Sequence, residues 1–248
     1  METIIDISYL LGAICFIYGL KMLSHPKTAR NGNIIASAGM LIAVVTTVYL
    51  GRSDISLSML AIAMIIGSII GVFFAIRVEM TQMPQLVAIF NGFGGGASAL
   101  VASSEFLKNG PESSLFLLVS IILSVLIGTL TFTGSFIAFG KLQGLVTTKP
   151  VTFKGQQMLN AIIAITIITF AYLTPSYGIN AFYIIISLSA LLGILLVIPI
   201  GGADMPVVIS LLNSYSGIAA AMTGFVLVSS GNTSAGNALI ICGSLVGA

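Results

Sequence analysis

Two segments of the sequence carry the same polar pattern within apolar surroundings. Each begins with Met-Pro and, seven residues after the proline, reaches an asparagine that opens Asn-[Gly/Ser]-[Phe/Tyr]-[Gly/Ser]-Gly. The two asparagines are Asn91 and Asn213. Proline is well tolerated in the first turn of a helix, and at 1.5 Å per residue each asparagine then lies about 10 Å along its helix. A buried amide at that depth must find hydrogen-bond partners or water.

Small residues follow each asparagine on one helix face, at four, seven and eleven positions further on. The first set is Gly95, Ser98 and Ala102, and the second is Gly217, Ala220 and Gly224. In one interpretation the two helices only pack closely, and the amides join them by hydrogen bonds. In the other, the stripes line a polar path. The candidate path residues are Asn91, Asn213, Ser98, Gly95 and Gly217.

Carboxylates precede both Met-Pro pairs. Asp204 ends the run Gly201-Gly202-Ala203-Asp204, and Glu79 lies before the first pair. A carboxylate near a helix N-terminus is stabilised by the helix dipole, so helix capping is one interpretation of both. The flanking glycines favour a hinge or coupling role for Asp204, with Glu79 as a second coupling candidate. The remaining acidic residues considered are expected to be solvated at membrane edges: Glu2, Asp54, Glu105 and Glu112.

Three other features carry no chemistry. The run Gly92–Ala97 fits the dinucleotide pattern G-x-G-x-x-[GA], but it lies in an apolar span without the strand and acidic residue that the pattern needs. His25 is expected to be an exposed loop residue. Cys15 and Cys242 lie far apart in apolar runs and form no metal-ligand or redox spacing.

The composition tells which elements must hold these residues. Of the 248 residues, 57% are hydrophobic and 6% are charged, and mean hydropathy is +1.14. Soluble domains carry about 25% charged residues. A chain of this size could not hide so much apolar surface in one soluble core. This excludes an ordinary soluble enzyme, a disordered chain and a nucleic-acid binder, and it predicts an all-α polytopic transmembrane helical bundle.

About nine spans are expected, given that some 20 apolar residues cross a bilayer. The predicted spans are 4–23, 33–50, 56–76, 84–104, 114–140, 157–173, 179–199, 206–229 and 236–248. The ninth is too short to cross, so the sequence is expected to be part of a longer protein. The connections are too short for a domain, so a soluble active site would lie outside residues 1–248. No predicted span holds a lysine, arginine, aspartate, glutamate or histidine near its middle, which is unusual for a proton-coupled protein.

The basic residues indicate the orientation. Connections after odd-numbered spans hold Lys21, Lys27, Arg30, Arg77, Lys141, Lys149 and Lys154, whereas those after even-numbered spans hold Arg52 and Lys108. Because basic residues favour the cytoplasmic side, the N-terminus is expected outside and the C-terminal side in the cytoplasm.

The stretches 77–95 and 201–217 resemble the beta subunit of proton-translocating nicotinamide nucleotide transhydrogenase. The resemblance implies that residues 1–248 form the transmembrane proton-translocating domain, followed in the family by a cytoplasmic NADP(H)-binding domain that is absent here. It also implies a partner alpha subunit that binds NAD(H) and a homodimer of protomers. The expected membrane is the bacterial inner membrane, with the mitochondrial inner membrane as the alternative. Protons moving inward would drive hydride transfer from NADH to NADP+ in the soluble domains.

By position, the resemblance implies that Asn213 and Asn91 face the proton path and that Asp204 couples its inner mouth to the nucleotide domain. Many family members carry a histidine at the position of Asn91 and a glutamate at that of Gln85. Histidine suits proton relay because its pKa lies near 6.5, whereas an amide does not titrate. Three explanations are open: a partner helix supplies the ionisable group, water held by Asn91 and Asn213 carries the proton, or the protein does not pump. The first is favoured. The alternative functions are a secondary ion-coupled transporter with polar, broken helices and a purely structural membrane anchor.

Overall fold

The structure, a computed structural model, describes residues 2–50 and 56–248, and in these ranges it contains helices and connections but no strand. The nine α-helices there are α1 (Glu2–Leu23), α2 (Ala29–Leu50), α3 (Leu57–Arg77), α4 (Met83–Asn109), α5 (Leu115–Leu142), α6 (Gln156–Tyr177), α7 (Ile179–Val197), α8 (Met205–Ser229) and α9 (Thr233–Gly247). Eight are long and apolar enough to cross a membrane, and α9 has 15 residues. The predicted all-α class is confirmed, and the chain is an integral membrane protein.

Apolar composition and local end signals together explain these helices. A segment within a bilayer must satisfy its own backbone hydrogen bonds, and a helix does so without partners. Ser114 begins α5 by accepting a hydrogen bond from the Leu117 N–H at 3.3 Å. Gly110 follows α4 with φ 73° and Gly178 follows α6 with φ 57°, a backbone region that favours glycine. Short connections follow from these sharp ends.

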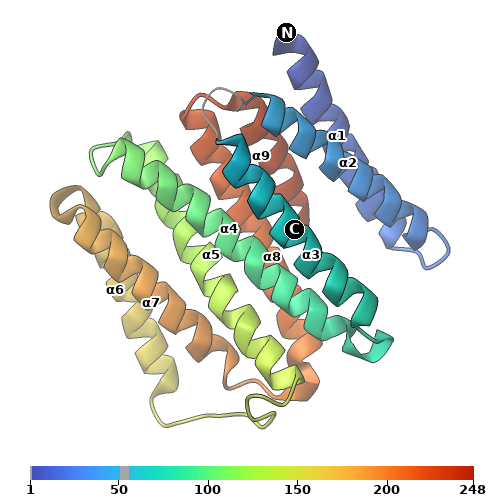
Figure 1. Cartoon of the computed structure of the whole chain (residues 1–248). Coiled ribbons are helices and arrows are strands. Elements are labelled where there is room, and N and C mark those ends of the chain that lie inside the picture. Colours follow the sequence, from blue (N-terminus) through green and yellow to red (C-terminus); the bar gives the residue numbers. More distant parts are fainter. Residues whose placement is uncertain (1, 51–55) are drawn as a thin grey trace. The chain divides into compact units, whose positions relative to one another are not determined.

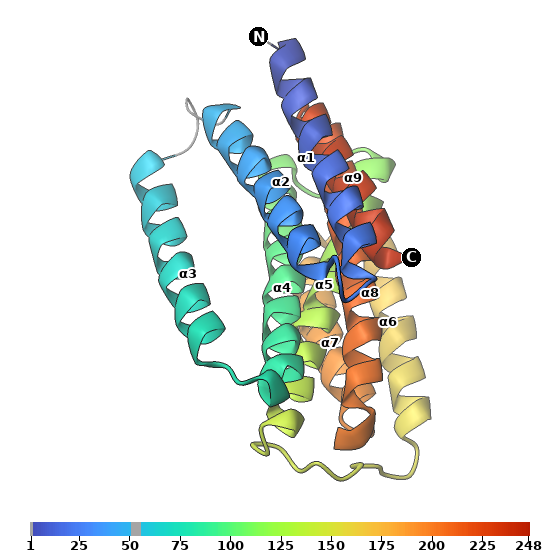
Figure 2. The ribbon, with the colours of Figure 1, turned by 90° about the vertical axis from the view of Figure 1, so that its right-hand side faces the viewer.

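The chain divides into two compact units, residues 1–80 and 81–248. In the first, α1 and α2 pack side by side as a hairpin (Figure 2). Their backbones approach closely, since a Cβ added to Gly32 would lie 2.7 Å from the carbonyl oxygen of Gly19. The Tyr9 and Thr47 hydroxyls are hydrogen-bonded at 2.9 Å. Helix α3 has no buried residue.

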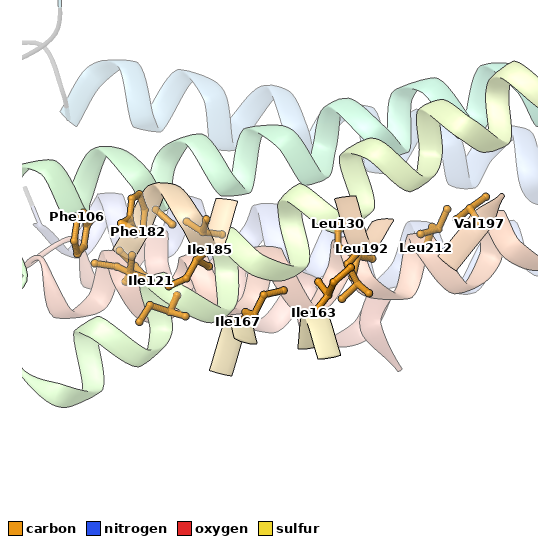
Figure 3. Packing of buried hydrophobic residues seen from close by; sticks show 14 of the residues in the cluster. Phe106, Ile121, Leu130, Ile163, Ile167, Phe182, Ile185, Leu192, Val197 and Leu212 are labelled. Carbon is orange, nitrogen blue, oxygen red and sulfur yellow. The ribbon is translucent and has the colours of Figure 1, made fainter. Parts of the chain in front are cut away.

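Helix α5 is the centre of the second unit (Figure 1). It packs against α4, α7 and α8, while α9 packs on α8 and α6 packs on α7. The apolar core lies along α5 and includes a stacked pair, Phe106 of α4 and Phe182 of α7, with ring centroids 4.1 Å apart (Figure 3). Since α5 contacts α4 and α8 at once, polar side chains of α5 can form hydrogen bonds to both helices.

The repeated Met-Pro pattern has a repeated local structure. A short 3₁₀ turn precedes each helix, η2 (Met80–Gln82) before α4 and η3 (Gly202–Asp204) before α8. Pro84 and Pro206 both lie in the first helical turn, as predicted. The residues before the two helices, Gln82 and Asp204, have nearly the same backbone angles, φ −98° and −92° with ψ 0°. The two segments therefore enter their helices in the same way.

Several predicted helix ends were too early, and two of them affect buried charged residues. Helix α4 continues to Asn109, beyond the predicted end at residue 104, and α5 continues to Leu142, beyond residue 140. These extensions place Glu105 and Lys141 inside helices. Arg52 and Asp54, which also entered the predictions, lie outside the described residues.

Candidate functional site

Asn91 is buried where α4 meets α5 and α8. Its Nδ2 donates to Ser135 Oγ of α5 at 3.0 Å, and its backbone oxygen accepts from Ser216 Oγ of α8 at 3.3 Å. The side chain is 8% exposed, and its Oδ1 has no hydrogen-bond partner among the described residues. The amide therefore joins three helices and retains an open acceptor.

Two turns further along α4, a second polar contact joins the same three helices. The hydroxyl oxygens of Ser124 (α5) and Thr223 (α8) lie 2.7 Å apart. They lie 3.3 and 3.4 Å from the backbone oxygen of Ser98 on α4. Both hydroxyls are buried, and a hydroxyl can donate and accept at once. The two hydroxyls therefore connect α4, α5 and α8 through one continuous set of hydrogen bonds.

Thr131 of α5 lies between these two contacts. It is fully buried, and its hydroxyl has no partner in the described part of the chain. It packs beside Gly95, where an added Cβ would come within 3.0 Å of the Thr131 Cβ and 2.8 Å of the Gly128 carbonyl oxygen. An unpaired buried hydroxyl costs about 1–3 kcal/mol, and ordered water is its usual partner in a protein interior.

These side chains form one feature, here called the polar seam. Its members are Asn91, Ser98, Ser124, Thr131, Ser135, Ser216 and Thr223. Two further buried polar atoms without partners, Asn160 Oδ1 and Ser189 Oγ, lie on α6 and α7, outside the seam. In the described ranges, only the seam combines such open atoms with hydroxyls that contact three helices.

A constant register between α4 and α8 holds the seam together. Ser216 contacts Asn91, Thr223 contacts Ser98, and Ser230 contacts Glu105, each pair 125 residues apart. A fixed offset means that the two helices run in the same direction. The contacts recur every seven residues, the spacing of left-handed helix packing. Each seventh position along α4 therefore meets a hydroxyl of α8.

Glu105 lies beyond the seam on the same face of α4. The residue is 9% exposed, so the expectation that it is solvated was wrong. Its Oε1 accepts from Lys108 Nζ at 2.9 Å, and its Oε2 accepts from Ser230 Oγ at 2.9 Å and Asn109 Nδ2 at 3.2 Å. These three donors hold a carboxylate inside the helical contact, which hydropathy alone does not reveal.

The opposite end of α4 carries an amide pair. Gln85 Nε2 donates to the backbone oxygen of Leu142 at 3.0 Å, and its Oε1 accepts from Gln143 Nε2 at 2.6 Å. The amide thus uses both its donor and its acceptor to join the start of α4 to the end of α5. A single carboxylate could not make both contacts while ionised.

Asn213 does not reach Asn91. The repeat places the two asparagines 122 residues apart, whereas α4 and α8 contact each other at an offset of 125. Ser216, three residues later, therefore occupies the position opposite Asn91. The Asn213 side chain is exposed in this chain. Gly217 packs against α9, where an added Cβ would come within 2.7 Å of the Gly243 carbonyl oxygen.

Lys141 is the other buried charged residue among those described. Its Nζ donates to the backbone oxygens of Ile198 at 2.6 Å, Ile200 at 2.8 Å and Lys149 at 3.1 Å. No carboxylate in the described ranges forms an ion pair with it. The ammonium thus fastens the end of α5 to the end of α7 and to the connection 143–155, which crosses this end of the unit (Figure 2).

The two candidate coupling carboxylates are exposed. Asp204 is the residue directly before α8, and its side chain makes no capping hydrogen bond there. Glu79 lies outside the helices, between α3 and η2. The backbone just before Asp204 is anchored, because the Gly202 N–H donates to the Thr148 backbone oxygen at 2.8 Å. An exposed carboxylate on a fastened connection is available to a partner.

The run Gly92–Ala97 does not fit a nucleotide. An added Cβ at Gly92 would lie 3.3 Å from the Phe136 ring, and one at Gly96 would lie 2.9 Å from the Phe132 ring. The segment is continuous helix, so its N–H groups are used within α4. The glycines serve close packing, and no group of three or more metal-ligating residues occurs in the described ranges.

Known proteins share this sequence pattern over nearly the whole chain. Residues 5–248 match the family described as "PNTB: NAD(P) transhydrogenase beta subunit". Two curated relatives, both named "NAD(P) transhydrogenase subunit beta" and both from Rhodospirillum rubrum, one of them from strain ATCC 11170, are 44% identical over 251 residues. The match covers 97% of this chain and 52% of each relative. The chain therefore spans about half the length of the curated relatives it matches.

Proposed function

Because this chain belongs to the NAD(P) transhydrogenase beta subunit family, we propose that residues 1–248 form the proton-translocating membrane part of such an enzyme. The observation that carries the proposal is the polar seam, a line of shared hydroxyls and open acceptors between helices that are otherwise apolar. Protons would move inward along it, and this movement would drive hydride transfer from NADH to NADP+ in attached soluble domains.

The orientation of the seam follows from the basic residues. Seven follow odd-numbered predicted spans and two follow even-numbered ones, which favours a cytoplasmic position for the ends that carry the seven. The Met83 end of α4 then faces the cytoplasm, and the Asn109 end faces outward. Gln85, Lys141 and Asp204 lie at the inner mouth, and Glu105 lies at the outer end.

The nucleotides bind elsewhere in the complete enzyme. The glycine run Gly92–Ala97 is packed against aromatic rings, and the curated relatives are about twice as long as this chain. NADP(H) would bind a domain that follows these residues in the full-length protein, and NAD(H) would bind the alpha subunit. That subunit and the lipid bilayer are the expected partners, in a homodimer of protomers in the bacterial inner membrane.

The seam would conduct by relay between hydroxyls and water. Ser124 and Thr223 can each accept a proton from one neighbour while donating to the next. The open oxygens of Asn91 and Thr131 can hold the water molecules that link such contacts. Amides do not titrate, so Asn91 would orient water and would not carry the proton itself.

The proposal is tested by Asn91→Leu in the complete enzyme, reconstituted in liposomes. Leucine has a similar volume and removes the amide, so inward proton movement should fall about a hundredfold. A pH-sensitive dye inside the liposomes measures it during hydride transfer. Asn180→Leu, at an exposed position of α7, is the control and should be unchanged. Full proton movement in assembled Asn91→Leu would contradict the path and favour a merely packed interface.

A further inference from the structure

We propose that Glu105 is the proton-accepting side chain at the outer end of the polar seam. The inference rests on the proposed function, and it names the ionisable group that Asn91 and Gln85 cannot supply. It replaces the expectation that a partner helix must provide that group. The carboxylate would accept a proton from outside water and pass it inward to the seam.

The first argument is position. Asn91, Ser98 and Glu105 are spaced by seven residues on α4, and all three are buried. Each meets a hydroxyl of α8 at the same register. Glu105 therefore continues the line of the seam by one further repeat. Among the described residues it is the only buried acidic side chain, and membrane-embedded acids usually have functional roles.

The second argument is access on one side. The partner of Oε1, Lys108, has a side chain that is 68% exposed, and Ser230, which donates to Oε2, is also exposed. The carboxylate itself is covered. Lys108 is its only charged hydrogen-bond partner, and Glu112 in the next connection is exposed without an ion pair. Glu105 can thus exchange protons with outside water past the ammonium group.

The third argument is the connection inward. Seven residues, about 10 Å along the helix, separate Glu105 from Ser98. Ser120 of α5 lies one turn from Ser124 on the same face and is buried. Its hydroxyl donates to the Phe116 oxygen at 2.8 Å, which leaves its oxygen free to accept. Ser120 and water can therefore bridge the interval between Glu105 and the pair Ser124–Thr223.

The transfer balances without a redox step. Hydronium in the outside water gives H+ to a carboxylate oxygen of Glu105 and becomes water, and an O–H bond forms on the carboxyl group. That O–H then donates its proton to a seam water, the carboxylate is regenerated, and each oxygen along the line releases one proton as it accepts another. The proton leaves toward the cytoplasm near Asn91.

The test uses the complete enzyme in liposomes and three variants. Glu105→Gln keeps an acceptor for Ser230 and Asn109 but cannot take up a proton, so proton movement should fall at least about tenfold. Glu105→Asp should restore part of it with a displaced pH profile, which a structural ion pair would not do. Glu112→Gln, the exposed neighbour, should behave as the unchanged enzyme.

Each outcome decides between the proposals. If the unchanged enzyme moves no protons, the proposed function fails, and the role of Glu105 fails with it. If it moves protons and assembled Glu105→Gln moves them equally well, only the role of Glu105 is overturned. Should Glu105→Gln not assemble, infrared difference spectra of the unchanged and Glu105→Asp enzymes decide. A carboxylic acid band that appears on outside acidification and shifts in Glu105→Asp supports the proposal, and its absence overturns it.

Discussion

At the residue scale, Thr131 separates a proton path from a simple packing contact. Its hydroxyl is buried without a partner among the described residues, in the interval between Asn91 and Ser124. In an interface without water, the unpaired hydroxyl would lower the stability of the fold. In a hydrated interface, it would form a hydrogen bond to a water molecule. The two interpretations therefore predict opposite results for the same substitution.

Thr131→Val removes the hydroxyl at nearly constant volume. We expect inward proton movement to fall about tenfold with no gain in thermal stability, because water bound at Thr131 would lose a partner. A dry contact would instead become about 1 kcal/mol more stable, with proton movement unchanged. Thermal unfolding and dye-monitored proton movement of the complete enzyme measure the two effects.

The matched control for this substitution is Thr133→Val. The Thr133 hydroxyl donates to the Ala190 oxygen of α7 at 2.9 Å and lies outside the seam. Its loss should cost about 1 kcal/mol of stability and leave proton movement unchanged. Equal loss of proton movement in both valine variants would show a general packing effect and contradict the path through Thr131.

At the element scale, Lys141 shows how a charge can connect helix ends without an ion pair. Its ammonium binds three backbone oxygens from two connections, and the residue is completely buried. A hydrogen bond to a charged donor contributes about 1.5–3 kcal/mol. The contacts offset the cost of burying the charge, and they fix the segment that leads into Asp204.

Lys141→Met should release these connections. The three oxygens would lose their donor, so we expect a loss of about 3 kcal/mol and faster proteolysis within residues 143–155. Limited proteolysis followed by mass spectrometry measures this directly. Lys154→Met, at an exposed position of the same connection, should cleave at the original rate. Unchanged cleavage in Lys141→Met would mean that the lysine contacts do not hold the connection.

Hydropathy predicted the helices better than their contacts. Glu105 and Lys141 each lie one residue beyond a predicted span, because charged residues end an apolar run in sequence although the helix itself continues. The repeat correctly predicted the Met-Pro starts of α4 and α8. It could not predict their relative register, so Ser216, and not Asn213, is the residue of α8 that meets Asn91. A register depends on which side chains pack between two helices, and a sequence with apolar residues on every helix face does not reveal this.

At the scale of the whole molecule, the proposed function requires that the membrane part be coupled to a nucleotide-binding partner. The chain spans about half of its curated relatives, and Asp204 presents an exposed carboxylate at the proposed cytoplasmic mouth. Coupling between two sites is reciprocal, so if proton occupancy changes NADP(H) affinity, NADP(H) must change proton affinity by the same factor. A residue that transmits this coupling should affect both measurements equally.

Asp204→Asn should weaken the coupling without blocking the seam. The side chain makes no hydrogen bond within the described residues, so its substitution should leave assembly and thermal stability unchanged. We expect the dependence of NADP+ affinity on outside pH to shrink about tenfold, or 1.4 kcal/mol, and the NADP+ dependence of proton uptake to shrink by the same factor. Titration calorimetry and dye-monitored proton uptake of the complete enzyme give the two values.

Glu79→Gln, the other exposed carboxylate before a Met-Pro helix, shows whether the effect belongs to Asp204 alone. If NADP+ affinity instead fell equally at every pH and its dependence on outside pH stayed the same, Asp204 would act in nucleotide binding itself and not in the coupling.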